Sequence, residues 1–445
     1  MSSINPETIV QKKKRNGLLA ISPMILLIIT FLTTGISFGD FYKVPLLLIF
    51  ILTSAYAIIT TPNYTINERI NHFSRGAGNK NLLYMVWIFI LAGAFANSAK
   101  TMGAIDATVS ITLSLLPESL LLPGIFVTAC FVSLSIGTSV GTIVALTPIA
   151  SGFSAETGLN LPLIASATVG GALFGDNLSF ISDTTIAATR TLGCKMKDKF
   201  KVNFKIVLPA AIITTIVYAI LGSDVAPYAN PNPITPTTVL CMLPYLAVLI
   251  SAIAGLNVIT TLCVGILLNG IIGMAVVNCS LFDWFASITQ GINGMGELIL
   301  ISMIAGGLLE LIRINGGITY IIHRLTRRVK NTKGAECSIA LLVSITNCCT
   351  ANNTIAILSV GKIANDISER FNIDKRRSAS LLDICSCIVQ GFIPYGAQLL
   401  IAAGIASISP LQIIPYLYYP MLLAITVVLS IAFSYPKLHA QKYRQ

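Results

Sequence analysis

Two aspartates lie close together in an apolar part of the chain, in the stretch GALFGDNLSFISDTTIAATR. Carboxylates and hydroxyls are hard oxygen ligands, and they suit a small cation such as Na⁺ better than a soft metal or a phosphate. If the stretch is helical from Gly175 onward, Asp176, Ser179 and Asp183 fall at i, i+3 and i+7 and share one helix face. The pattern predicts a site in which carboxylates bind Na⁺ or a proton, and its candidate residues are Asp176, Asn177, Ser179, Ser182 and Asp183.

The composition indicates an integral membrane protein. Of the 445 residues, 54% are hydrophobic and 11% are charged, whereas about a quarter are charged in an average soluble domain. The mean hydropathy is +0.81. Several apolar runs reach the ~20 residues that a helix needs to cross the bilayer core, and the alternating pattern of a membrane barrel is missing. We therefore expect an all-α polytopic membrane protein.

The net charge of +11 comes from basic residues that cluster in short loops. These clusters are KKKR from residue 12, KMKDKFKVNFK from 195, HRLTRRVKNTK from 323 and DKRRS from 374. Cytoplasmic loops carry such an excess of Lys and Arg, and no fingerprint of a nucleic-acid-binding module accompanies the charge, so we expect no nucleic-acid partner. The ten cysteines have no framework spacing, and with three histidines in the chain they predict neither a cysteine metal site nor a cofactor.

The membrane setting makes the two aspartates unusual. An aspartate at the centre of a membrane helix costs about 2.5 to 3.5 kcal/mol, so its presence is a functional-site hypothesis in itself. Two other interpretations exist. Asp183 precedes an apolar run and is a good residue to cap a helix N-terminus. The pair could also be the dyad of an intramembrane aspartyl protease, but the two carboxylates of such a dyad usually come from separate segments. We therefore expect a protein that is not an enzyme.

The sequence resembles itself when it is shifted by about half its length. The window LAGAFANSAKTMGAID aligns with IAGGLLELIRINGGIT and pairs Gly103 with Gly316. With the offset changed by one residue, TIVALTPIASGFSAETGLNLP aligns with TIAILSVGKIANDISERFNID and pairs Thr142 with Thr354. Two windows that share almost one offset predict a two-fold internal repeat.

Charge indicates how the two halves are oriented. No Lys or Arg occurs between Lys100 and Arg190, whereas basic residues flank the equivalent region of the second half on both sides. One flank is therefore external and the other cytoplasmic, which makes the repeats inverted, as in many secondary transporters. The predicted parts are a cytoplasmic N-terminal tail (1–17), a first transmembrane repeat (18–222), an external linker (223–236), a second repeat (237–433) and a cytoplasmic C-terminal tail (434–445).

Each half is expected to contain a hairpin and an interrupted transmembrane helix. The hairpins run over about 120–156 and 335–366, and their apolar arms surround the polar stretches GTSVGT and NCCTANNT. Broken backbone at membrane depth is tolerated where it is buried in protein or lines a watery cavity, whether the hairpin is re-entrant or fully spanning. An equally open alternative is that Gly137 and Gly141 allow close helix packing and the threonines bond their own backbone. The tip candidates for ion binding are Thr138, Ser139, Thr142, Asn352, Asn353 and Thr354.

A third acidic position breaks the symmetry of the repeat. Glu310 stands where the first half has Asn97, so it adds a group that can bind a proton. The alternative, equally open, is an ion pair with Arg313 one turn further along the helix. Asp383 and Gln390, near the second interrupted span QGFIPYGAQ, are further candidates.

Three long stretches carry a resemblance to a known family. FSRGAGNKNLLYMVWIFILAGAFANSAKTMGAIDATV, GTSVGTIVALTPIA and GGALFGDNLSFISDTTIAATRTLGCKMKDKFK closely resemble the NhaC family of sodium/proton antiporters, over nearly the whole chain. The resemblance implies exchange of Na⁺ for H⁺ across a bacterial cytoplasmic (inner) membrane without ATP. In related families the tips of hairpins in inverted repeats hold sodium and substrate. The same broad family includes exchangers of carboxylates and amino acids.

The expected function is therefore Na⁺/H⁺ antiport by alternating access, in which buried carboxylates bind Na⁺ or H⁺ in competition. The alternative is a Na⁺- or H⁺-coupled exchanger of a small carboxylate or amino acid. An anion carrier should offer a fixed cation or free helix N-termini at mid-membrane, and the sequence places no Lys or Arg in the core of the first half. We expect a multi-pass protein with both termini in the cytoplasm, and the sequence leaves the oligomeric state open, a homodimer included.

Overall fold

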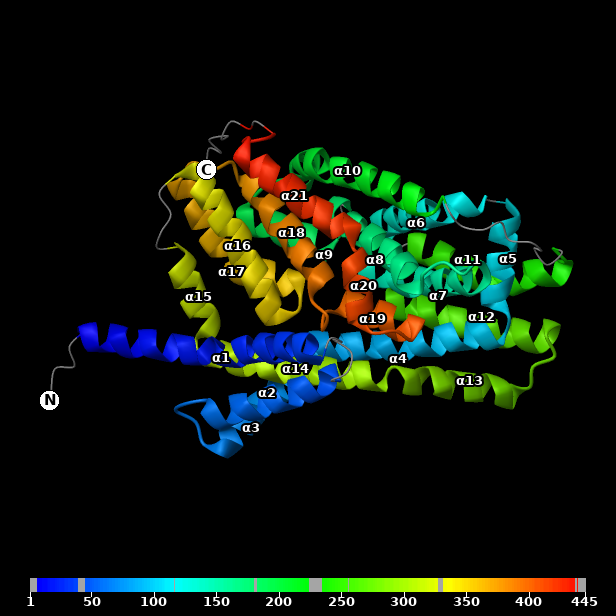
Figure 1. Ribbon diagram of the computed structural model, residues 1–445, viewed down its shortest axis with the longest axis horizontal. Helices are drawn as coiled ribbons and strands as arrows, with labels where there is room; N and C mark the ends of the chain where they lie inside the picture. Colours follow the sequence, from blue (N-terminus) through cyan, green and yellow to red (C-terminus); the bar gives the residue numbers. More distant parts are fainter. Residues whose placement is uncertain are drawn as a thin grey trace.

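The computed structural model describes residues 6–38, 45–115, 117–179, 182–223, 234–254, 256–326, 331–436 and 438. Within these residues the secondary structure is helical, without strands, which confirms the expected all-α class (Figure 1). Five described helices are long and apolar enough to cross a membrane, or six if the bent pair Pro410–Tyr416 and Tyr418–Ala432 forms one span. Shorter apolar helices accompany them.

The first half of the chain begins with α1 (Pro6–Phe38), α2 (Leu46–Thr60), α3 (Ile66–Ala77), α4 (Lys80–Thr101) and α5 (Ala104–Leu115). A short 3₁₀ turn (Glu118–Leu120) leads into a hairpin of α6 (Leu121–Ile136) and α7 (Ser139–Thr157). An interrupted helix made of α8 (Leu161–Leu178) and α9 (Asp183–Leu192) follows, and α10 (Met196–Leu221) ends the half.

The second half has the same order of elements. It starts with α11 (Pro236–Ile253), α12 (Val258–Val276), α13 (Leu281–Gly294), α14 (Gly296–Ile314) and α15 (Gly317–Thr326). Its hairpin is α16 (Thr332–Thr350) and α17 (Asn353–Arg370), and its interrupted helix is α18 (Lys375–Phe392) and α19 (Ala397–Ala406). The half ends with α20 (Pro410–Ile413), the 3₁₀ helix η2 (Ile414–Tyr416) and α21 (Tyr418–Ala432).

The contacts between the halves are reciprocal. Helix α4 packs against α13 as α14 packs against α3, and α7 packs against α19 as α17 packs against α9. In Figure 1, α4 runs towards α5 on the right, whereas α14 runs towards α15 on the left, so the two equivalent helices point in opposite directions. Gly103 and Gly316, which the sequence alignment pairs, both have a left-handed backbone, with φ of 74° and 78°. The two repeats are therefore inverted.

The second sequence window has the wrong register. It pairs Thr142 with Thr354, but α7 begins at Ser139 and α17 at Asn353, so the structural counterpart of Thr354 is Val140. A recurring hydrogen bond supports the structural register: Ser133 Oγ donates to the Ala172 carbonyl (2.6 Å), and Asn347 Nδ2 donates to the Ser386 carbonyl (2.7 Å). Apolar helices match one another at several offsets, which explains the error.

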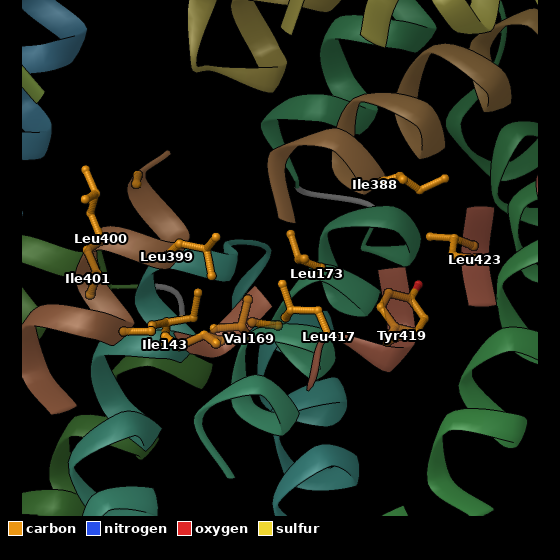
Figure 2. Packing of buried hydrophobic residues seen from close by; sticks show 14 of the residues in the cluster. Ile143, Val169, Leu173, Ile388, Leu399, Leu400, Ile401, Leu417, Tyr419 and Leu423 are labelled. Carbon is orange, nitrogen blue, oxygen red and sulfur yellow. The ribbon is translucent and has the colours of Figure 1, made fainter. Parts of the chain in front are cut away.

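The two hairpins and the two interrupted helices share one core. Figure 2 shows Ile143 of α7 and Val169 of α8 packed near Leu399 of α19, with Leu417 and Tyr419 beside α8. All five side chains are buried. Glycine permits a close contact between the first hairpin and the first interrupted helix, because a Cβ on Gly175 would overlap Ser133 of α6. This packing fixes the end of α8, and thereby Asp176, against the first hairpin.

Candidate functional site

A cavity of about 540 Å³ lies where the hairpin tips and the interrupted helices of both repeats meet. Each tip is a helix break: Gly137 follows α6 and Ala351 follows α16, both with left-handed backbone. The candidate residues that line the cavity are Thr138, Ser139, Asp176, Ser182, Asp183, Asn352, Asn353, Thr354 and Gln390. The structure thus brings together nine candidate residues from four separate stretches of the sequence.

Asp176 is the buried carboxylate of this cavity. It stands in the last turn of α8 with 4% of its surface exposed. Its Oδ1 accepts a hydrogen bond from the backbone N–H of Ser139 at 2.8 Å, and Ser139 is the first residue of α7. The Ser139 side chain is a further hydrogen-bond partner of the carboxylate. The positive end of α7 therefore faces Asp176 and stabilises its charged form.

Asp183 differs from Asp176 in its surroundings. It is exposed and begins α9, whose N-cap is Ser182, so Asp183 does not cap the helix. The expectation of one shared helix face is also wrong, because α8 ends at Leu178 and Ser179 already has extended backbone. Asp176 and Asp183 meet instead across the break between α8 and α9, where both line the cavity.

The other polar residues of this stretch take different positions. Ser182 lines the cavity, and its hydroxyl lies 3.0 Å from that of Thr184. Ser179 is buried at the C-terminal end of α8. Asn177 is fully buried and points away, because its Nδ2 donates to the Leu173 carbonyl (3.1 Å) and to the Tyr419 hydroxyl (3.3 Å). Neither Ser179 nor Asn177 is among the described residues that line the cavity.

The hairpin-tip candidates also differ in their positions and hydrogen bonds. The Thr142 hydroxyl donates to the Thr138 carbonyl (3.1 Å) and is buried, so this threonine bonds its own backbone as the alternative interpretation expects. At the second tip, Asn352 Oδ1 accepts from Ile355 N–H and Asn353 Oδ1 accepts from Thr354 N–H, both at 3.0 Å. The two asparagines therefore cap the start of α17 while they line the cavity.

Two glutamines connect the second tip with the first. Gln390 Nε2 donates to the carbonyl of Ala351 (3.2 Å) and to Gln398 Oε1 (2.8 Å). Gln398 Nε2 donates in turn to Ser139 Oγ (3.0 Å). The backbone N–H of Ser139 donates to Asp176, so hydrogen bonds through these residues link one hairpin tip, by way of the second interrupted helix, to the buried carboxylate.

Glu310 lies elsewhere. It forms a two-bond ion pair with Arg313, with Nε to Oε2 and Nη2 to Oε1 both at 2.7 Å. The pair lines a neighbouring cavity of about 380 Å³ between α3, α14 and the second hairpin. Residues 85, 351 and 352 line both cavities, so the tip of the second hairpin stands between Glu310 and Asp176.

One buried cation, Lys199, was not expected from the sequence. Lys199 of α10 is 1% exposed, and its Nζ contacts Asp383 Oδ2 (2.6 Å), Thr185 Oγ1 (2.7 Å) and the Asn177 carbonyl (3.1 Å). Asn203 Nδ2 donates to the same carbonyl (2.7 Å) and the same carboxylate oxygen (2.8 Å). The statement that the first half has no basic residue in its core is therefore wrong.

A signal for this cation was present in the sequence. Lys199, Val202, Asn203 and Ile206 fall at i, i+3, i+4 and i+7, and all four are buried on one face of α10. Its neighbours Lys197, Lys201 and Lys205 are exposed, which made the whole segment look like a cytoplasmic loop.

Comparison with known proteins covers nearly the whole chain. The family model described as "Na+/H+ antiporter family" matches residues 8–223 and 229–435. The Na⁺/H⁺ antiporter NhaC of Alkalihalophilus pseudofirmus is 28% identical over 331 residues, which cover 67% of this chain and 69% of that protein. NhaC of Bacillus subtilis is 26% identical over 398 residues (81% and 84%). A malate-2H⁺/Na⁺-lactate antiporter of B. subtilis is 21% identical over 450 residues (93% and 94%).

Proposed function

The chain belongs to the Na⁺/H⁺ antiporter family, and on this premise we propose that it exchanges Na⁺ for H⁺ at the cavity between its hairpin tips. One observation carries the proposal: Asp176 is a buried carboxylate in a cavity to which both inverted repeats contribute. Such a carboxylate binds either a small cation or a proton. Antiport requires a group of this kind.

Competition for Asp176 couples the two ions. A proton or a sodium ion each neutralises the carboxylate, and binding of one excludes the other. The empty, charged form is the costly one in a low-dielectric barrier, so the carrier changes its orientation in a loaded form. Thr138 and Ser139 supply hydroxyl oxygens at the first tip, Ser182 supplies a hydroxyl across the helix break, and Asp183 supplies a carboxylate there. These oxygens complete the ligand set for Na⁺.

Alternating access follows from the two inverted repeats, which we assign to 18–222 and 237–433. In transporters of this architecture one repeat or bundle moves against the other around a fixed central site. The basic clusters at residues 195 and 374 support a cytoplasmic position for those loops. The proposed setting is a bacterial cytoplasmic membrane, with both termini in the cytoplasm.

An exchanger of small carboxylates is supported less well. Such a substrate needs a fixed cation or a free helix N-terminus. Lys199 is a buried cation, but Asp383 neutralises it. The start of α17 is capped by the side chains of Asn352 and Asn353. Lys199 and the start of α17 are therefore occupied by groups of the chain itself.

The test is transport by the purified protein in proteoliposomes that contain a pH-sensitive dye. An inward Na⁺ gradient, with no organic solute present, should drive H⁺ outward in the wild type. Asp176→Asn should abolish this flux, because the amide keeps the shape but cannot titrate. Asp366→Asn, which changes an exposed carboxylate on α17, is the matched control and should leave the flux unchanged. Flux that appears only after addition of a carboxylate or an amino acid would contradict the proposal.

A further inference from the structure

Gln390 occupies in the second repeat the position of Asp176 in the first. Asp176 is the third residue from the end of α8, which ends at Leu178, and Gln390 is the third from the end of α18, which ends at Phe392. The recurring hydrogen bond between hairpin and interrupted helix supports the same register. Both residues line the cavity. The inverted repeats therefore face the cavity with a carboxylate on one side and an amide on the other.

The surroundings of Gln390 fix which way its amide points. Its Nε2 donates to two acceptors, the Ala351 carbonyl and Gln398 Oε1. The Ala351 carbonyl cannot donate, so the amide nitrogen must face it. The side chain is 1% exposed, and among the described residues Oε1 has no hydrogen-bond donor. A buried acceptor without a partner is unfavourable, and a bound cation removes this cost.

We infer that Gln390 Oε1 is a ligand for the transported cation, contributed by the second repeat opposite Asp176. The inference rests on the proposed function and adds to it a residue that sets ion affinity. Asp176 and Gln390 are joined through Ser139 and Gln398, with successive bonds of 2.8, 3.0 and 2.8 Å. The first bond of this series starts at Gln390 and the last one ends at Asp176, so the two ligands are held in fixed positions relative to each other.

The chemistry of the pair favours a monovalent cation. An amide carbonyl is a hard oxygen ligand, as a carboxylate is. Because the amide is neutral, Asp176 carries the one negative charge among the buried ligands, which one Na⁺ balances, whereas Asp183 in the same cavity is exposed. A second buried carboxylate in place of Gln390 would leave a net negative charge after Na⁺ binds, and burial of that charge is costly. The replacement of Asp by Gln at the equivalent position thus matches the site to a single charge.

Two substitutions separate a ligand from a structural role. Gln390→Met and Gln390→Glu both remove the Nε2 donor to Ala351, but Gln390→Glu keeps an oxygen at the Oε1 position. If Gln390 is a ligand, Gln390→Met should raise the KM for Na⁺ about tenfold, which corresponds to the binding free energy of one lost ligand bond. Gln390→Glu should keep the KM at or below the wild-type value. A structural role through Nε2 predicts equal impairment of both variants and would overturn the inference.

Na⁺ binding itself provides a readout that does not depend on transport. The shift of the thermal unfolding midpoint is titrated with NaCl against choline chloride in detergent, because a ligand that binds the folded state stabilises it. Asn269→Leu is the control. Asn269 is a buried amide between α12 and α4, its Oδ1 also lacks a donor within the described structure, and it does not line the cavity. It should lower stability without changing Na⁺ affinity.

The outcomes distinguish this inference from the proposed function. If wild type binds Na⁺, Asp176→Asn does not, and Gln390→Met binds with wild-type affinity, the inference fails and the proposed function stands. If wild type shows no Na⁺ binding, both fail. If Gln390→Met does not fold, Gln390→Asn takes its place. It keeps the amide but withdraws the oxygen by one methylene, and it should also raise the KM.

Discussion

Lys199 Nζ lies 2.6 Å from Asp383 Oδ2, and both side chains are buried, with exposed fractions of 1% and 0%. The ammonium also bonds the Asn177 carbonyl at the end of α8, next to Asp176. This carbonyl is one of those left free by the interruption of the helix. The ion pair therefore joins α10 and α18 to the broken end of α8 and holds the break in place.

Loss of one partner should destabilise the fold far more than loss of both. Lys199→Met leaves Asp383 charged and unpaired, which costs about 3 to 5 kcal/mol. The double variant Lys199→Met/Asp383→Leu removes both charges and should recover most of that stability. The measurement is the free energy of unfolding in mixed micelles. Lys201→Met, which changes an exposed residue of the same helix, serves as the control. A single variant as stable as the wild type would show that the pair is not structural.

Asp176 could be predicted from the sequence as a candidate site residue, whereas the buried position of Lys199 was not. An aspartate far from any basic residue in an apolar segment is conspicuous, since only a function or a partner offsets its cost. Lys199 sits among exposed lysines near a helix start, where the positive-inside rule already explains a basic residue. Its partner Asp383 lies in the other repeat, so the pair exists only after both halves have packed.

An interrupted helix was expected in the first half, but the position of its break, after Leu178, was hidden for a related reason. The second break contains Pro394 and Gly396, both ordinary signals for a helix end. The residues between Leu178 and Asp183 include neither proline nor glycine, so the local sequence allowed a continuous helix. Tertiary packing of the α8 end against α6 and α10 determines where the helix ends instead. The hairpins, by contrast, carried polar tips in apolar arms and could be predicted.

Glu310→Gln should leave exchange close to wild type. Glu310 pairs with Arg313 in a neighbouring cavity, and Arg313 is 64% exposed, so the pair contributes at most about 1 kcal/mol to stability. Na⁺-driven H⁺ flux and protein abundance should both persist in Glu310→Gln and in the charge-swapped variant Glu310→Arg/Arg313→Glu. A flux that disappears in Glu310→Gln at normal abundance would instead make Glu310 a proton-coupling group.

Labelling of introduced cysteines should reveal opposite orientations of the two hairpins. A cysteine at Glu156, at the base of the first hairpin, should react with an impermeant maleimide from outside. Cysteines at Lys197 and Arg376 should react only after the membrane is permeabilised. The background is a variant in which Cys337, which is exposed on α16, is serine. Labelling of all three positions from one side would overturn the inverted topology.

The pH dependence of Na⁺ affinity tests whether Asp176 binds both ions. As the pH falls, protons occupy the carboxylate and sodium must displace them, so the apparent KM for Na⁺ should rise by about tenfold per pH unit once the protonated form dominates. As the pH rises, the site becomes deprotonated, and the KM should fall and then level off.

Asp176→Asn should show no Na⁺-dependent flux at any pH. Asp183→Asn, which changes the exposed carboxylate of the same cavity, should keep the pH profile with a higher KM. The measurement is the initial rate of Na⁺-driven H⁺ flux at several Na⁺ concentrations, over about four pH units around neutrality, with equal internal and external pH at the start. A KM that stays constant over that range, with only the maximal rate changing, would mean that Na⁺ and H⁺ bind at different sites, and the carrier carboxylate would have to be sought at Asp183 and then at Glu310.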